Sequence, residues 1–224
     1  MTASFLSGLS GRSHALVFAG QSTPWTQALA DLRGDPVLWE SLTSLMDEAE
    51  TRLGPVSADL MKAVGHPVSV VDEAAMATGD EAESSRIPDS SDAAVSVPGI
   101  ALAQCGAFLD LVQLGYGQDS RPRAVMGHSQ GVLAARMVNA VLRTGSVDRA
   151  RKDIVDTLMI ARLIGAAATR CAGILGIRAQ GDATPMLSVT GMTPAQARAL
   201  IGRIPDARGP VGLAVVHDAG RVVL

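Results

Sequence analysis

The sequence predicts an α/β protein, because short apolar runs typical of strands alternate with longer stretches of helical spacing. The apolar run at 14–19 (HALVFA) ends in a Gly-Gln-Ser loop, which predicts a buried strand followed by a loop. A second run at 124–126 leads into the pentapeptide Gly127-His128-Ser129-Gln130-Gly131 and then into a helical pattern. From residue 185 the pattern is strand, helix and two strands, a βαββ order.

Composition limits what this chain of 224 residues is able to do. Hydrophobic residues make up 47% but aromatic residues only 3%, so the core must be built from Ala, Val, Leu, Ile and Met. The net charge is −3 and no Lys/Arg cluster stands out, so no nucleic-acid partner is expected. Cys105 and Cys171 lack metal-ligand spacing, which predicts no metal site and favours a reducing compartment.

We also expect no membrane span and no secretory signal. No segment approaches a clean apolar run of about 18 residues, the length needed to cross a bilayer. The N-terminal segment places Arg12 and His14 ahead of its short apolar run and shows no clear cleavage site beyond it. The sequence therefore predicts a cytoplasmic protein.

Apolar residues recur at helical spacing between these landmarks. The predicted helices cover residues 24–53, 97–114, 132–143 and 147–168. Residues 71–92 are acidic and rich in Ser and Ala, which predicts a surface loop or disordered insertion. In the βαββ segment, Thr193 and Pro194 are of the types preferred at the N-cap and first position of a helix. The tripeptide Asp218-Ala219-Gly220 marks the turn between the last two strands.

A G-x-S-x-G turn between a strand and a helix is the arrangement of a nucleophilic serine. Such a turn lifts the Ser129 hydroxyl out of the backbone, and the first amide of the following helix lies near any carbonyl that the serine attacks. The loop Gly20-Gln21-Ser22, directly after the first strand, is placed to supply a second backbone amide. The alternative is a Gly-rich turn that only packs a helix onto a sheet.

Together the Gln21 loop, the GHSQG turn and the βαββ tail resemble the malonyl/acetyl-CoA:acyl-carrier-protein transacylase family. The GHSQG spelling and the tail segment PMLSVTGMTP are similar to the N-terminal acetyl transferase region of type I fatty acid synthases, the fungal and actinobacterial kind. The resemblance runs from about residue 14 to 224. It implies an α/β-hydrolase-like core over 1–182 and the beginning of an inserted ferredoxin-like small subdomain over 183–224.

The resemblance also implies roles for individual residues. Ser129 matches the nucleophile, and the backbone amides of Gln130 and Gln21 match the donors to the oxyanion. His128 matches the histidine beside the nucleophile, where a packing role and a catalytic role both stay open. The implied reaction moves an acetyl group from acetyl-CoA to Ser129 and then to the phosphopantetheine thiol of an acyl carrier protein, with no permanently bound cofactor. The implied partners are that carrier and the other domains of a large homo-oligomeric synthase.

Selectivity for the acyl group is expected to depend on the second helix after the serine turn. Relatives that use malonyl groups carry an arginine before a glycine there, and this arginine pairs with the free carboxylate. In this chain Ile164 precedes Gly165, which favours a short apolar acyl group and hence acetyl. Arg162 points about 200° away from Ile164 on a helix and is expected to be solvated. A one-turn shift in the alignment would instead make Arg162 a carboxylate clamp.

A serine nucleophile needs a general base, usually histidine, and the resemblance implies that it lies beyond Leu224. His14 begins a strand, His66 precedes a proline in a loop, and His217 falls in the tail. The chain is therefore expected to be a fragment that is inactive alone. The alternatives are a malonyl-type or polyketide-type transacylase and a structural or interface fragment. A simple esterase fits poorly, because it needs an acid and a histidine after Ser129 within one compact core.

Overall fold

The computed structural model describes residues 8–9, 12–20, 25–64, 92–117, 121–174, 187–204 and 211–224. The chain divides into two compact units, Met1–Cys171 and Ala172–Leu224. The predicted division was between residues 182 and 183. Apart from its last residue, Asp92, the predicted insertion at 71–92 lies outside the described residues.

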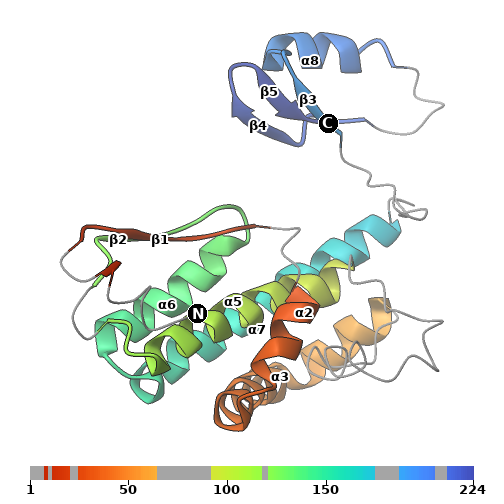
Figure 1. Cartoon of the computed structure of the whole chain (residues 1–224). Helices are drawn as coiled ribbons and strands as arrows, with labels where there is room; N and C mark the ends of the chain where they lie inside the picture. Colours follow the sequence, from red (N-terminus) through yellow and green to blue (C-terminus); the bar gives the residue numbers. More distant parts are fainter. Residues whose placement is uncertain are drawn as a thin grey trace, which may run out of the picture. The chain divides into compact units, whose positions relative to one another are not determined.

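The first unit is an α/β arrangement in which helices outnumber strands (Figure 1). Its two strands, β1 and β2, pair in parallel with Ala15 opposite Ala124 and Phe18 opposite Gly127. Helix α6 packs against both strands, and α5 contacts α2, α3 and α6. The elements are β1 (Ala15–Phe18), α2 (Trp25–Leu32), α3 (Pro36–Val64), α5 (Ala93–Gln113), β2 (Ala124–Gly127), α6 (Gly131–Thr144) and α7 (Val147–Ile174).

Helix α5 lies at the centre of the hydrophobic core. It begins at Asp92, whose carboxylate accepts a hydrogen bond from the Ala94 amide at 2.8 Å. Aliphatic side chains make up most of this core, but Trp25, Phe108 and Tyr116 are buried in it too, so the prediction of a core built from Ala, Val, Leu, Ile and Met alone was wrong for these three residues. The largest fully buried side chains are Phe108, Leu29, Leu42, Leu45, Met46, Ile100, Leu102, Met137, Ile154, Leu158 and Val95.

Two helices in the described part of the chain are long and apolar enough, by length and composition alone, to cross a membrane. These are α5 and α7, so the expectation that no segment approaches such a run was wrong. The apolar window of α5 is 72% buried inside the protein, the situation of a core helix. A core helix meets the same length and composition test as a membrane span, so this finding is weak evidence for a membrane.

The prediction that the first strand is buried was wrong for one of its faces. Leu16, Phe18 and Val125 are partly buried against the core. On the other face, Val17 is 66% and Met126 51% exposed. The reason is that the described helices cover only one face of the β1–β2 pair.

Two helix predictions also change. The predicted helix 24–53 is broken at Arg33-Gly34-Asp35 into α2 and α3, because the Asp35 carboxylate accepts from the Val37 and Leu38 amides and caps a new helix. The helix predicted over 147–168 runs on to Ile174.

The second unit has the predicted strand, helix, strand, strand order. Its elements are β3 (Ser188–Thr190), α8 (Pro194–Ile201), β4 (Val215–Asp218) and β5 (Arg221–Val223). The sheet order is β3-β5-β4 with antiparallel neighbours, so β3 and β4 are parallel and β5 lies between them, a split βαβ unit. Thr193 caps α8 as predicted, in a reciprocal capping box with Gln196.

Candidate active site

Ser129 lies in the turn that joins β2 to α6, and its backbone is in the left-handed region. Its φ is 54°, and it is the only non-glycine residue with a positive φ in the described part of the chain. For a residue with a Cβ this conformation costs about 1–2 kcal/mol, so the surrounding structure must impose it. The residue is exposed. A strained, exposed serine between a strand and a helix has the geometry of a nucleophile elbow.

Close backbone contacts explain the two glycines of the motif. A Cβ on Gly127 would lie 2.3 Å from the backbone of Gly131, so the turn closes this tightly only without a side chain there. A Cβ on Gly131 would lie 2.3 Å from the Phe18 oxygen and 2.5 Å from the Ala19 oxygen. The first turn of α6 therefore packs directly on the backbone at the end of β1. A hydrogen bond of 2.9 Å from the Gly131 amide to the His128 oxygen closes the turn.

The segment that follows β1 is held against this turn. The His128 amide donates to the Phe18 oxygen at 2.9 Å. A Cβ on Gly20 would lie 3.0 Å from the Cβ of Ser129, so the backbone at Gly20 packs against Ser129. Gln21, the predicted oxyanion residue of this loop, lies outside the described residues. The structure thus brings the start of the predicted loop to Ser129.

The other predicted oxyanion donor is the amide of Gln130, at the N-cap of α6. The amides of the next three residues donate to the oxygens of His128, Ser129 and Gln130, while the described backbone hydrogen bonds leave the Gln130 amide unused. An unused amide at a helix N-terminus lies in positive potential and favours a negative oxygen. The arrangement is what a donor to an oxyanion requires.

A comparison with known protein families finds a match over most of the chain. Residues 16–212 match the family described as starter unit:ACP transacylase in aflatoxin biosynthesis. The chain belongs to this transacylase family. Membership of an acyl-carrier-protein transacylase family, predicted from the Gln21 loop, the serine turn and the βαββ tail together, is confirmed. The match begins at the second residue of β1, includes β2 and the elbow, and ends before β4.

A solved structure is also similar to this transacylase-family chain. The acyl-carrier-protein S-malonyltransferase of Burkholderia pseudomallei 1710b shares 21% sequence identity with it, at a TM-score of 0.47. The match covers 95% of this chain and 54% of that protein, so the chain spans about half of the malonyltransferase's length. A comparison with curated proteins finds no match.

His14 lies at the opposite end of the β1–β2 pair from Ser129. His14 is at the N-terminal end of β1, whereas Ser129 follows the C-terminal end of the parallel strand β2. The Nδ1 of His14 donates to the Arg12 oxygen at 3.0 Å, so its Nε2 accepts from the Tyr116 hydroxyl at 2.8 Å. Burial raises the pKa of the Tyr116 hydroxyl and keeps this donor protonated. His14 is therefore part of a hydrogen-bonded pair at the end of the strands away from Ser129.

Of the remaining histidines, His128 is the residue directly before Ser129. A Cβ on Gly20 would lie 3.4 Å from its Nδ1, so the imidazole lies against the segment after β1. His217 is in β4 of the second unit, and His66 lies outside the described residues.

The prediction that Arg162 is solvated was wrong. Its side chain is only 4% exposed and donates to the Ala94 oxygen at 2.9 Å, with the Glu50 carboxylate 3.6 Å away. Arg162 lies on the buried face of α7, one turn before Gly165, which packs on the Ala93 oxygen. The sequence contains a signal for this burial, because Arg162 lies at helical spacing from the apolar and small residues that form the buried face of α7. Ile164, by contrast, is 49% exposed.

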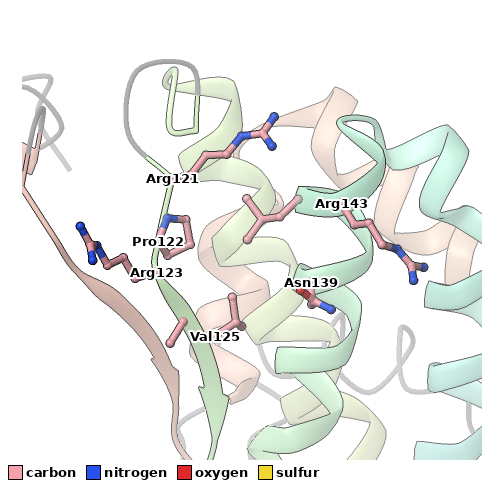
Figure 2. A pocket seen from close by; sticks show the side chains of 8 residues that line it. Arg121, Pro122, Arg123, Val125, Asn139 and Arg143 are labelled. Carbon is pink, nitrogen blue, oxygen red and sulfur yellow. The ribbon is translucent and has the colours of Figure 1, made fainter.

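A hollow of about 220 Å³ lies at the other end of β2 (Figure 2). Arg121 and Arg123 line it just before β2 begins, and Arg143 lines it from α6. In Figure 2 the guanidinium group of Arg123 points to the opposite side from those of Arg121 and Arg143, and that of Arg143 pairs with Asp153 at 2.7 Å. The hollow is therefore separate from the Ser129 turn and has no converging charges.

Proposed function

We propose that this chain carries the nucleophile and the oxyanion donors of an acyl-CoA:acyl-carrier-protein acyltransferase. In the first half-reaction, the Ser129 hydroxyl attacks the thioester carbonyl of acetyl-CoA, loses its proton to a base, and forms an acetyl ester as CoA leaves as the thiol. In the second, the phosphopantetheine thiol of an acyl carrier protein attacks this ester. The acetyl group passes to sulfur and the serine hydroxyl is regenerated.

The observation that carries the proposal is the left-handed backbone of Ser129 beside the Gln130 amide at the start of α6, which the described backbone hydrogen bonds leave unused. A turn that only packed a helix on a sheet would not require a strained non-glycine residue at its exposed tip. The Gly20 backbone against Ser129 supports a second donor from the adjacent Gln21 amide. Losing one such donor typically costs about 2.7–4 kcal/mol of activation free energy.

We propose acetyl as the acyl group. Ile164 offers no hydrogen-bond donor to a carboxylate, and its half-exposed side chain presents hydrocarbon. Arg162, the other candidate to bind a malonyl carboxylate, is held inside the protein by the Ala94 oxygen and Glu50. Both observations favour a short uncharged acyl group over malonyl.

The setting of the reaction belongs to the same proposal. We place the chain in a large homo-oligomeric type I fatty acid synthase in the cytoplasm, with the carrier protein as partner and no permanently bound cofactor. His14 is engaged with Tyr116 at the far end of the strands, so we propose that a different histidine of the full-length protein is the general base. We also propose that the first unit is part of an α/β-hydrolase-like core. The split βαβ unit around β5 supports a ferredoxin-like small subdomain.

The test is to load the full-length protein with labelled acetyl-CoA and malonyl-CoA side by side. Acetyl should be transferred to Ser129 and then to the carrier, and Ser129→Ala should abolish both steps. Ile164→Arg should shift loading toward malonyl. Equal or better malonyl loading of the unaltered protein would instead favour the malonyl-type transacylase. No loading of Ser129 from either thioester would favour a structural or interface role.

A further inference from the structure

Gln104 is a polar residue on the central helix α5, and its side chain reaches the segment after β1. Its Nε2 donates to the Ala19 oxygen at 2.8 Å. Gln104 itself is half-buried, and its neighbours in the chain, Ala103 and Cys105, are 2% and 1% exposed. A carbonyl oxygen only accepts, so the amide end of Gln104 must face Ala19.

The oxygen of the same carboxamide is buried, and among the residues that the structure describes it has no hydrogen-bond partner. Leaving a buried acceptor unpaired is unfavourable, and an apolar residue of similar size would avoid that cost. Stability alone therefore does not explain a glutamine at position 104. What the residue provides is the bond to Ala19.

The Ala19 oxygen lies at the contact between three elements. A Cβ on Gly131 would lie 2.5 Å from it, so the first residue of α6 packs on one side of the oxygen while Gln104 of α5 binds it. Because a peptide group is planar, fixing this oxygen also fixes the direction of the Gly20 amide. Gly20 is the residue whose backbone contacts Ser129. Gln104 is therefore connected to Ser129 through one hydrogen bond, to the Ala19 oxygen, and through the peptide group that joins Ala19 to Gly20.

We propose that Gln104 is a positioning residue for catalysis. Its hydrogen bond to the Ala19 oxygen sets the backbone at Gly20 against Ser129. This inference rests on the proposed function, in which the adjacent Gln21 amide is an oxyanion donor. Gln104 itself touches neither the nucleophile nor the substrate.

The experiment compares Gln104→Leu and Gln104→Glu with Gln113→Leu in the full-length protein. Gln113 is the exposed last residue of the same helix, so its variant is the matched control. Three quantities are measured: the rate of acetylation by acetyl-CoA, the rate at which a fluorophosphonate labels Ser129, and the midpoint temperature of thermal unfolding. Fluorophosphonate labelling passes through an oxyanion at the same serine but needs no CoA, so it tests the elbow independently of the acyl donor.

Gln104→Leu should slow both acetylation and labelling by about 10-fold or more, with an unchanged KM for acetyl-CoA, because misplacing a catalytic group by about 1 Å can cost about 10²-fold. Gln113→Leu should leave both rates unchanged. Gln104→Glu places a carboxylate against the Ala19 oxygen and should be slow at neutral pH. As the pH falls, the carboxylic acid form regains a donor, so the rate of Gln104→Glu relative to the unaltered protein should rise. A merely structural role would not produce this pH-dependent recovery.

Equal rates for Gln104→Leu and Gln113→Leu at temperatures where both are folded would overturn the inference. So would a Gln104→Glu rate that stays at a constant ratio to the unaltered protein as the pH changes. If the unaltered protein reacts with the fluorophosphonate but not with acetyl-CoA, the proposed function fails while the labelling rates still decide the role of Gln104. If Ser129 reacts with neither, both are overturned.

Discussion

Gly131→Ala tests the packing of the serine elbow on the end of β1. The added Cβ would lie 2.3 Å from the Phe18 oxygen and 2.5 Å from the Ala19 oxygen, where contacts under 3.0 Å essentially never occur. Restoring 3.0 Å to the Phe18 oxygen requires a shift of about 0.7 Å, and both partners are backbone atoms that cannot rotate away. We expect a destabilisation of about 1–3 kcal/mol from overpacking, reduced by the better helix propensity of alanine.

The larger effect should fall on the chemistry. The shift separates the segment after β1 from Ser129, and a displacement of about 1 Å can cost about 10²-fold in rate. Ser129 acetylation and chemical denaturation are measured on the same preparation, with Gly173→Ala as the control. Gly173 has nothing within 4 Å of its Cβ position, so its variant should be as active and as stable as the unaltered protein, or slightly more stable. A Gly131→Ala protein that acetylates within about twofold of the control would refute the proposed packing of the loop on the elbow.

Three further predictions concern stability and reactivity. Arg162→Leu should lower the free energy of unfolding by about 1.5–3 kcal/mol, because it removes a charged hydrogen bond to the Ala94 oxygen and the ion pair with Glu50. The exposed Arg149→Leu should change it by under about 0.5 kcal/mol, and equal values for the two variants in denaturant titrations would contradict the buried placement of Arg162. Thr193→Ala should weaken α8 by about 1 kcal/mol, seen as faster amide hydrogen exchange in that helix, while Thr193→Ser should retain the cap; unchanged exchange would refute the capping box. Burial raises the pKa of the Cys105 thiol to about 12, whereas Cys171 is exposed. A thiol reagent at pH 8 should therefore modify Cys171 in the native protein and Cys105 only after unfolding. Fast labelling of Cys105 in the native protein would contradict its burial.

Features that depend on local chemistry were predictable from the sequence. The Thr193 cap, the hairpin turn after Asp218 and the strand–turn–helix around Ser129 all follow from residue types at fixed spacing. The left-handed backbone at Ser129 belongs to the same group, because the flanking glycines allow the tight approach that imposes it.

Features that depend on distant segments were not predictable in the same way. The apolar sequence of β1 predicts burial on both faces, but exposure is set by which helices reach the sheet, and Val17 is left open by the described ones. Arg162 has the composition of a solvated residue, yet the carbonyl of Ala94, 68 positions away, holds it inside. Gln104 shows why a polar residue between buried neighbours is a useful signal: its partner, Ala19, is 85 positions earlier. Capping and turns are local, whereas these pairings exist only once the helices have packed.

The most direct test of the central claim is to identify the residue that carries the acyl group. The full-length protein is incubated with acetyl-CoA without carrier, digested, and examined by mass spectrometry. We predict an acetyl ester on the peptide that contains Ser129, lost on adding the carrier protein and absent from Ser129→Ala. Acetyl transfer to the carrier that persists in Ser129→Ala, or an ester found only on another residue, would contradict the assignment of Ser129 as the nucleophile.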